Sequence, residues 1–166
     1  MALRLEIYSL QSCSGCDLMR RKTLSHPDIL GEIQSKWDLY EREEALGKDQ
    51  RFLWYPTTYA RDLSGEILRM EEGFIPAYEF MVFLRLAEAQ YLLRRHEYGA
   101  SWTLLEETRK NYSLSGLIPE CLYYLGVASH LNQDPRATAK VWRMLREHYG
   151  DSVWAHKVML QWPPLS

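Results

Sequence analysis

The chain has few cysteines, no long apolar run and almost no charge imbalance. Only three of its 166 residues are cysteine, and its formal net charge is −2. A chain this close to neutral lacks the basic footprint of a nucleic-acid-binding protein. No stretch approaches the roughly 18 apolar residues that span a bilayer, and the N-terminus does not have the pattern of a secretory signal. We therefore expect a cytoplasmic protein with neither a membrane nor a nucleic-acid partner, whose thiols stay reduced unless they are catalytic.

What the chain does have is a pair of cysteines between a predicted strand and a predicted helix. The apolar pattern of 3–10 predicts a buried strand, and 16–24 is rich in helix formers. A helix that begins near Ser14 places Cys13 at its N-terminus, where unpaired N–H groups and the helix dipole favour a thiolate. Cys16 then lies one turn further on, within reach of a mixed disulfide on Cys13. This spacing is typical of a redox-active dithiol.

Two other interpretations of the cysteine pair stay open at this point. Cysteine is often a small buried hydrophobe, so both thiols could be inert. The pair could also be half of a zinc site, but a closed site needs four ligands, and Cys121 and the five histidines show no finger-like spacing. We expect neither a metal nor another cofactor. Cys121 is at helical spacing from apolar residues and is expected to be buried and inert.

The next elements are predicted from breaks in the apolar pattern. Ser25 and Asp28 resemble a capping box that restarts the first helix at Pro27. The expected elements that follow are a strand at 36–42, a short helix or turn-rich connection at 43–54, a hairpin with its turn at 62–65, and a helix from about 76.

This order of elements resembles the thioredoxin-like family over residues 3–90. The matching residues are Cys13 and Cys16 after the first strand, His26-Pro27 at the helix break, Pro56-Thr57 before a strand, Asp62 and Gly65 in the hairpin turn, and Gly73 before the last helix. The resemblance implies an α/β thioredoxin-like domain in which Cys13 and Cys16 are catalytic and the substrate is a protein thiol or disulfide.

The same resemblance implies a substrate-binding role for Tyr55, Pro56, Thr57 and Gly73. Pro56 would be the family's cis-proline, packed against both sulfurs, and the backbone of Tyr55 would pair with a bound peptide as an added strand. Local sequence alone favours a plain proline at a strand start. The cysteine pair upstream favours the family's interpretation.

The chain also departs from the family's pattern. The residue before the first cysteine is Ser12, where the family usually has Trp, and the buried acid of the first strand is replaced by Ile7. Glu6 is expected on the opposite face of that strand. Without that acid, deprotonation of the second cysteine has no evident helper. Asp17 would oppose a thiolate, whereas Arg20 would favour one.

The C-terminal half is predicted to be all helical, and it partly resembles tetratricopeptide repeats. The expected helices are 76–96, 100–112, 119–132, 135–149 and 152–160. The first is apolar nearly all round, so we expect it to be shared between a domain at 1–90 and a helical domain at 91–162. Helix pairs beginning near Leu86 and Leu122 are about 36 residues apart, close to the roughly 34-residue period of the repeat.

Within the second helix pair, Leu125-Gly126 followed by Trp142 resembles the repeat's own pattern. Such repeats present a concave face to a protein or peptide partner. The aromatic candidates for that contact are Trp102, Tyr112, Tyr123, Tyr124, Trp142 and Trp154. The alternative is an ordinary pair of helical hairpins that caps a small domain.

These observations lead to three functional hypotheses. The first is a thiol-disulfide oxidoreductase in which Cys13 attacks, Cys16 resolves and the helical module selects the partner. The second is a non-catalytic adaptor for protein-protein interaction. The third is a redox sensor, in which oxidation of the pair changes partner binding.

Overall fold

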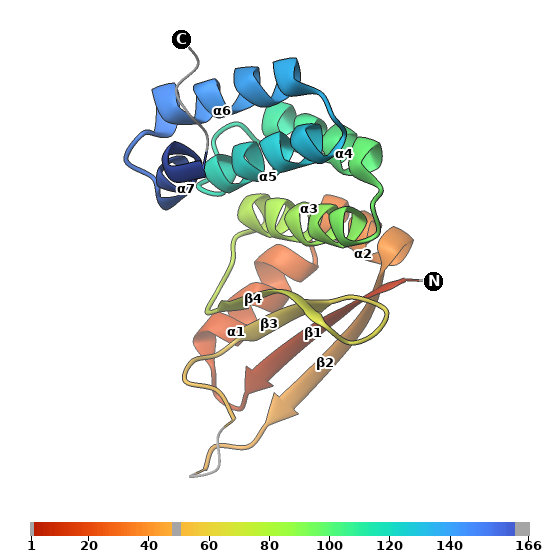
Figure 1. The fold of residues 1–166 in the computed structure, drawn as a ribbon. Coiled ribbons are helices and arrows are strands. Elements are labelled where there is room, and N and C mark those ends of the chain that lie inside the picture. Colours follow the sequence, from red (N-terminus) through yellow and green to blue (C-terminus); the bar gives the residue numbers. More distant parts are fainter. Residues whose placement is uncertain (1, 48–50, 162–166) are drawn as a thin grey trace. The chain divides into compact units, whose positions relative to one another are not determined.

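The computed structural model describes residues 2–47 and 51–161, which divide into two compact units, Met1–Ala87 and Glu88–Ser166 (Figure 1). The division falls inside one long helix, and residue 162, the predicted end of the helical domain, lies outside the described residues. The first unit contains β1 (Leu3–Leu10), α1 (Ser14–Leu18), the π-helix η1 (Met19–Leu24), α2 (Pro27–Lys36), β2 (Trp37–Glu44), β3 (Thr57–Arg61), β4 (Ile67–Glu72) and the start of α3 (Ala77–Arg94).

The strands form one mixed sheet in the order β2-β1-β3-β4. β1 and β2 run parallel, while β3 is antiparallel to both β1 and β4. The helices between β1 and β2 supply the crossover that a parallel pair requires. The chain is therefore a four-stranded mixed sheet followed by helices, in agreement with the predicted layout of an α/β part and a helical part.

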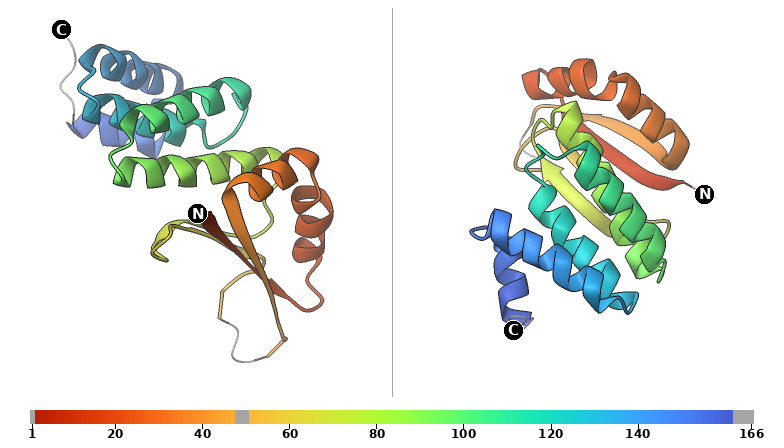
Figure 2. Two further views of the ribbon diagram at one scale, coloured as in Figure 1. Left: turned by 90° about the vertical axis from the view of Figure 1, so that its right-hand side faces the viewer. Right: turned by 90° about the horizontal axis from the view of Figure 1, so that it is seen from above.

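The alternating side chains of β1 separate the two faces of this sheet. Leu5 and Ile7 point to one face and are buried, whereas Arg4, which precedes Leu5, points to the other face and is exposed. Helices α1, η1 and α2 lie on one side of the sheet in the views of Figure 2. On the other face Glu6 forms ion pairs with Arg61 at 3.0 Å and Arg4 at 3.4 Å, so its charge is compensated there.

The break between η1 and α2 differs in detail from the predicted capping box. The N-cap of α2 is His26, whose Nδ1 accepts a hydrogen bond from the backbone N–H of Asp28 at 3.3 Å. Ser25 instead donates its hydroxyl to the carbonyl of Arg21. Pro27 occupies the first turn of α2 as predicted, where a missing N–H costs no hydrogen bond.

The connection between β2 and β3 is turn-rich rather than helical in its described residues, 45–47 and 51–56. One aromatic side chain ties it to the sheet: the ring of Phe52 lies 4.8 Å from that of Tyr8 and 5.8 Å from that of Tyr59. The hydroxyl of Tyr55 donates to Glu44 at the end of β2 and accepts from the N–H of Phe52. Residues 52–55 of the connection are thus tied to the sheet without regular structure.

The second unit consists of helices with well-defined starts. It contains the end of α3, then α4 (Tyr98–Asn111), α5 (Ile118–Leu131), α6 (Pro135–Tyr149) and α7 (Val153–Gln161). Asp134 caps α6 by accepting from the N–H of Ala137 at 3.0 Å, with Pro135 in the first turn, as the sequence predicts. Ser101 of α4 donates to the carbonyl of Ala89 in α3, which joins the first two helices of this unit.

Candidate functional site

The cysteine pair lies at the start of α1, as predicted. Cys13 is the N-cap, and its Sγ lies 3.1 Å from the N–H of Cys16. The two sulfurs are bonded in a disulfide, with the Cα atoms 5.3 Å apart. Cys16 is 1% exposed, whereas Cys13 is half-buried and lines a surface groove. Only one of the two sulfurs is therefore open to a partner.

Residues 55–56 lie against this helix start. The Tyr55–Pro56 peptide bond is cis, and the carbonyl oxygen of Tyr55 is 3.8 Å from Cys13 Sγ. A Cβ placed on Gly15 would lie 3.6 Å from both Pro56 Cδ and Tyr55 O, so the two segments are within van der Waals reach. Gly73 donates its N–H to the Pro56 carbonyl at 2.7 Å. The structure thus brings the predicted site residues to one place, while their roles stay predictions.

Thr57 and Gly73 both contact the segment 54–56. The Thr57 hydroxyl donates to the carbonyl of Trp54 at 2.7 Å, and its side chain is fully buried. Gly73 has a φ of +99°, a conformation that disfavours any side chain, and a Cβ there would lie 3.6 Å from the Trp54 ring. These contacts make both residues positioning elements for residues 54–56.

The charges near the pair largely neutralise one another. Arg20 donates to Asp17 at 3.3 Å and to Glu43 at 3.1 Å. Arg20, which was predicted to favour a thiolate, is thus paired with Asp17, which was predicted to oppose one. Ile7 is buried and Glu6 is committed to arginines on the other face of the sheet. The acid that the family's pattern would place behind the second cysteine is therefore not replaced by its neighbour in the sequence.

A surface groove, which the sequence did not lead us to expect, lies beside Cys13. Its volume is about 480 Å³. Its lining comprises Leu10, Ser12, Cys13, Ser14, Gly15, Leu46, Leu53, Trp54, Tyr55 and Phe74. The signal that could have revealed it is the apolar run 52–55 inside a polar connection.

The hydroxyl of Tyr55 remains a hydrogen-bond donor. Burial, followed by the hydrogen bond to Glu44, raises the pKa of Tyr55 above its usual value, so its hydroxyl stays protonated and keeps donating.

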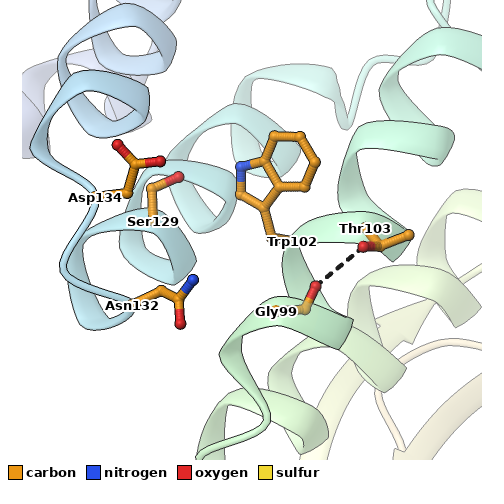
Figure 3. Close-up of a pocket in the computed structure, with 6 residues that line it drawn as sticks. All are labelled: Gly99, Trp102, Thr103, Ser129, Asn132 and Asp134. Carbon is orange, nitrogen blue, oxygen red and sulfur yellow. Dashed lines mark hydrogen bonds between the residues drawn. The ribbon is translucent and has the colours of Figure 1, made fainter.

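The helical unit has a hollow of its own, of about 310 Å³ (Figure 3). Trp102 of α4 forms one wall, and Ser129, Asn132 and Asp134, from α5 and the turn after it, lie across the gap. Of the aromatic candidates, Trp102 is the one that lines this hollow. Trp142 is buried, and Tyr123, Tyr124 and Trp154 form a separate ring cluster with centroids 5.2 to 5.9 Å apart.

Cys121 is fully buried, as predicted, and takes no part in the disulfide. Over residues 2–47 and 51–161, no group of three or more His, Cys, Asp or Glu side chains is arranged to hold a metal ion. Within the same ranges, no helix combines the length and apolar character needed to cross a bilayer.

Comparison with known proteins adds no family. No protein-family model matches the chain, and a search of the curated proteins returns no match. The structure itself defines a mixed-sheet unit that carries a cysteine pair at disulfide distance, followed by a helical region. Such a pair is compatible with redox function.

Proposed function

We propose that this protein is a thioredoxin-like thiol-disulfide oxidoreductase whose helical unit, with tetratricopeptide-like helix pairs, binds a protein or peptide partner in the cytoplasm. The observation that carries the proposal is the asymmetry of the pair: Cys13 is open to a groove, while Cys16 is buried one turn behind it. A thiol-disulfide oxidoreductase needs one sulfur that a substrate can reach. It needs a second sulfur that reacts only with the mixed disulfide formed on the first.

The exchange is balanced without any further reactant. In the reduced protein, the Cys13 thiolate attacks one sulfur of a substrate disulfide, forms the mixed disulfide and releases one substrate thiolate, which takes up a proton. The thiolate of Cys16 then attacks Cys13 Sγ, restores the bond seen here and releases the second substrate thiol. The substrate gains two electrons and two protons, and the protein loses the same number.

The surroundings of the pair fit these two steps. The N–H of Cys16 points at Cys13 Sγ and stabilises negative charge there in the attacking and leaving forms. The Tyr55 carbonyl lies 3.8 Å from the Cys13 sulfur, and Tyr55, Pro56 and Thr57 would orient the substrate backbone, with Gly73 holding Pro56. In the helical unit, the hollow beside Trp102 is the place where a partner would bind.

The test is a trapping experiment in the full chain. In a Cys121→Ser background, Cys16→Ser should accumulate mixed disulfides through Cys13 in cells, because the resolving thiol is missing. The matched control is Cys13→Ser in the same background, which leaves only the buried thiol of Cys16. Equal yields from the two variants, or no adducts from either when both are well expressed, would count against the proposal.

A non-catalytic adaptor is the second candidate. It is favoured by the buried Ile7, and by Glu6 facing away from the pair, because the second thiol then lacks an acid-base partner. For an adaptor, Cys13→Ser would leave both partner binding and cellular function intact. For an oxidoreductase, the same substitution abolishes function while partner binding through the helical unit persists.

A further inference from the structure

Resting on the exchange proposed at Cys13, we infer that the groove selects extended protein segments with a bulky apolar side chain beside the reacting cysteine. It selects against anionic low-molecular-weight disulfides such as glutathione disulfide. The side chains that would make this selection are Leu46, Leu53, Trp54 and Phe74, which line the groove and lie outside both the cysteine pair and the cis Tyr55–Pro56 bond.

The first observation is an exposed apolar wall next to a reactive sulfur. Leu53 is 89% exposed, Trp54 66% and Leu46 60%, and all three line the groove with Cys13. Phe74, three residues before the start of α3, lines the same groove. Large apolar side chains left this open in one place usually mark a contact site, because covering them removes apolar surface from water.

The second observation is the absence of charge from the lining. No described residue that lines the groove is basic or acidic. Just outside the lining, Glu44 is bonded to the Tyr55 hydroxyl and pairs with Arg51 at 3.8 Å, so these two charges are already matched to each other. Glutathione carries two carboxylates, which would lose water on entry and find no cation among these residues. A neutral segment with an apolar side chain loses no such hydration.

The third observation is that the wall is held in place without a ligand. The Trp54 carbonyl accepts a hydrogen bond from the Thr57 hydroxyl. The Trp54 ring lies against Gly73, so that a Cβ built on Gly73 would be 3.6 Å from Trp54 Cδ1. The Tyr55 hydroxyl joins this segment to the end of β2 through Glu44. A wall fixed in advance costs little ordering when a substrate binds, so its apolar surface contributes to selection and not only to contact.

The experiment compares three disulfides as substrates of reduced full-length Cys16→Ser/Cys121→Ser protein. Two are symmetrical disulfides of peptides that are identical except for Phe or Ser next to the cysteine, so that attack by Cys13 releases one copy of the same peptide as the thiol, and the third is glutathione disulfide. Rapid quenching and mass spectrometry give the rate constant for mixed-disulfide formation. We expect the Phe peptide to react at least about tenfold faster than the Ser peptide, in line with the discrimination that apolar pockets achieve, and glutathione disulfide to react slowest.

Variants of the wall then test its part in the preference. Leu53→Ser/Trp54→Ser should bring the Phe and Ser peptides to within about twofold of each other, whereas Leu63→Ser should keep the full preference. Leu63 is the matched control because it is an exposed leucine, 44% accessible, in the hairpin turn and outside the groove. The comparison of peptides in the unsubstituted groove does not depend on how the variants fold.

The possible results distinguish a failure of groove selectivity from a failure of disulfide exchange at Cys13. Equal rates for both peptides, or a preference that persists without Leu53 and Trp54, would overturn the inference and leave the exchange at Cys13 standing. Fastest reaction with glutathione disulfide would do the same. No adduct with any of the three disulfides would overturn both.

Discussion

Gly126 of α5 lies directly against the indole of Trp142 in α6. A Cβ built on Gly126 would be 1.9 Å from Trp142 Nε1, a distance that no real side chain tolerates. The same indole N–H donates to the Tyr123 carbonyl at 3.2 Å, which fixes the ring across α5. The two residues whose spacing resembled a tetratricopeptide repeat are therefore partners in the packing of α5 on α6.

Replacing Gly126 by alanine is expected to destabilise the helical unit. The methyl group has to displace a buried ring that is held by a hydrogen bond, and overpacking of this kind costs about 1–3 kcal/mol. Urea unfolding of the full chain, followed by circular dichroism, measures the loss. The control is Gly99→Ala in the first turn of α4, where a Cβ meets nothing within 4 Å. That change should be neutral or stabilising by up to about 1 kcal/mol; a similar loss in both variants would contradict the packing argument.

The ion pairs of Glu106 should make stability depend on pH in the acid range. Hydrogen bonds from Arg109 at 2.6 Å, aided by Lys110, lower the pKa of Glu106 in the folded protein. A depressed folded pKa gives a stabilisation that is fully present above the unfolded pKa and is lost as the pH falls through the folded one. Glu106→Gln should therefore cost about 0.5 kcal/mol at pH 7 and less at pH 3, as measured by urea unfolding.

A difference between wild type and Glu106→Gln that stays constant from pH 7 to pH 3 would contradict this assignment. Glu107→Gln is the matched control, because Glu107 is the exposed neighbour with no hydrogen bond among the contacts described for this helix. Its effect should be small at both pH values.

The hydroxyl of Tyr55 should determine how firmly the connection between β2 and β3 is held. Tyr55→Phe removes the donor to Glu44 and the acceptor for the Phe52 N–H, and leaves the ring in place. We expect faster amide hydrogen exchange across 51–55, measured by mass spectrometry, with β1 unchanged. Tyr40→Phe, on an exposed ring of β2, is the control and should change neither segment.

The same contact predicts a pH dependence on the alkaline side. Because burial and the bond to Glu44 raise the pKa of Tyr55 in the folded state, its contribution is present below the unfolded pKa of about 10 and is lost as the pH rises through the folded value. Exchange in wild type should therefore approach that of Tyr55→Phe once the pH exceeds the raised folded-state pKa of Tyr55. A gap that persists there would show that the hydroxyl is not the anchor.

Local sequence was a good guide wherever neighbours in the chain decide the structure. The alternation of β1, the start of α1 at Ser14 and the cap of α6 at Asp134 all depend on residues within one turn or a few positions, and all three were predicted. It failed at the cap of α2, where the side chain of His26 accepts from the N–H of Asp28 while Ser25 donates back to the carbonyl of Arg21.

By itself, the sequence determined the order of strands and helices and put one thiol at the beginning of a helix with its partner a turn behind, because hydrophobic period and capping act over a few residues. Only the tertiary structure decided that residues 45–47 and 51–56 form no helix, and that Leu53, Trp54 and Phe74 gather beside Cys13 in an uncharged groove. The groove brings together residues as far apart in the sequence as Cys13 and Phe74, which are 61 positions apart. These contacts depend on the pairing of β1 with β3, a choice that no local pattern encodes.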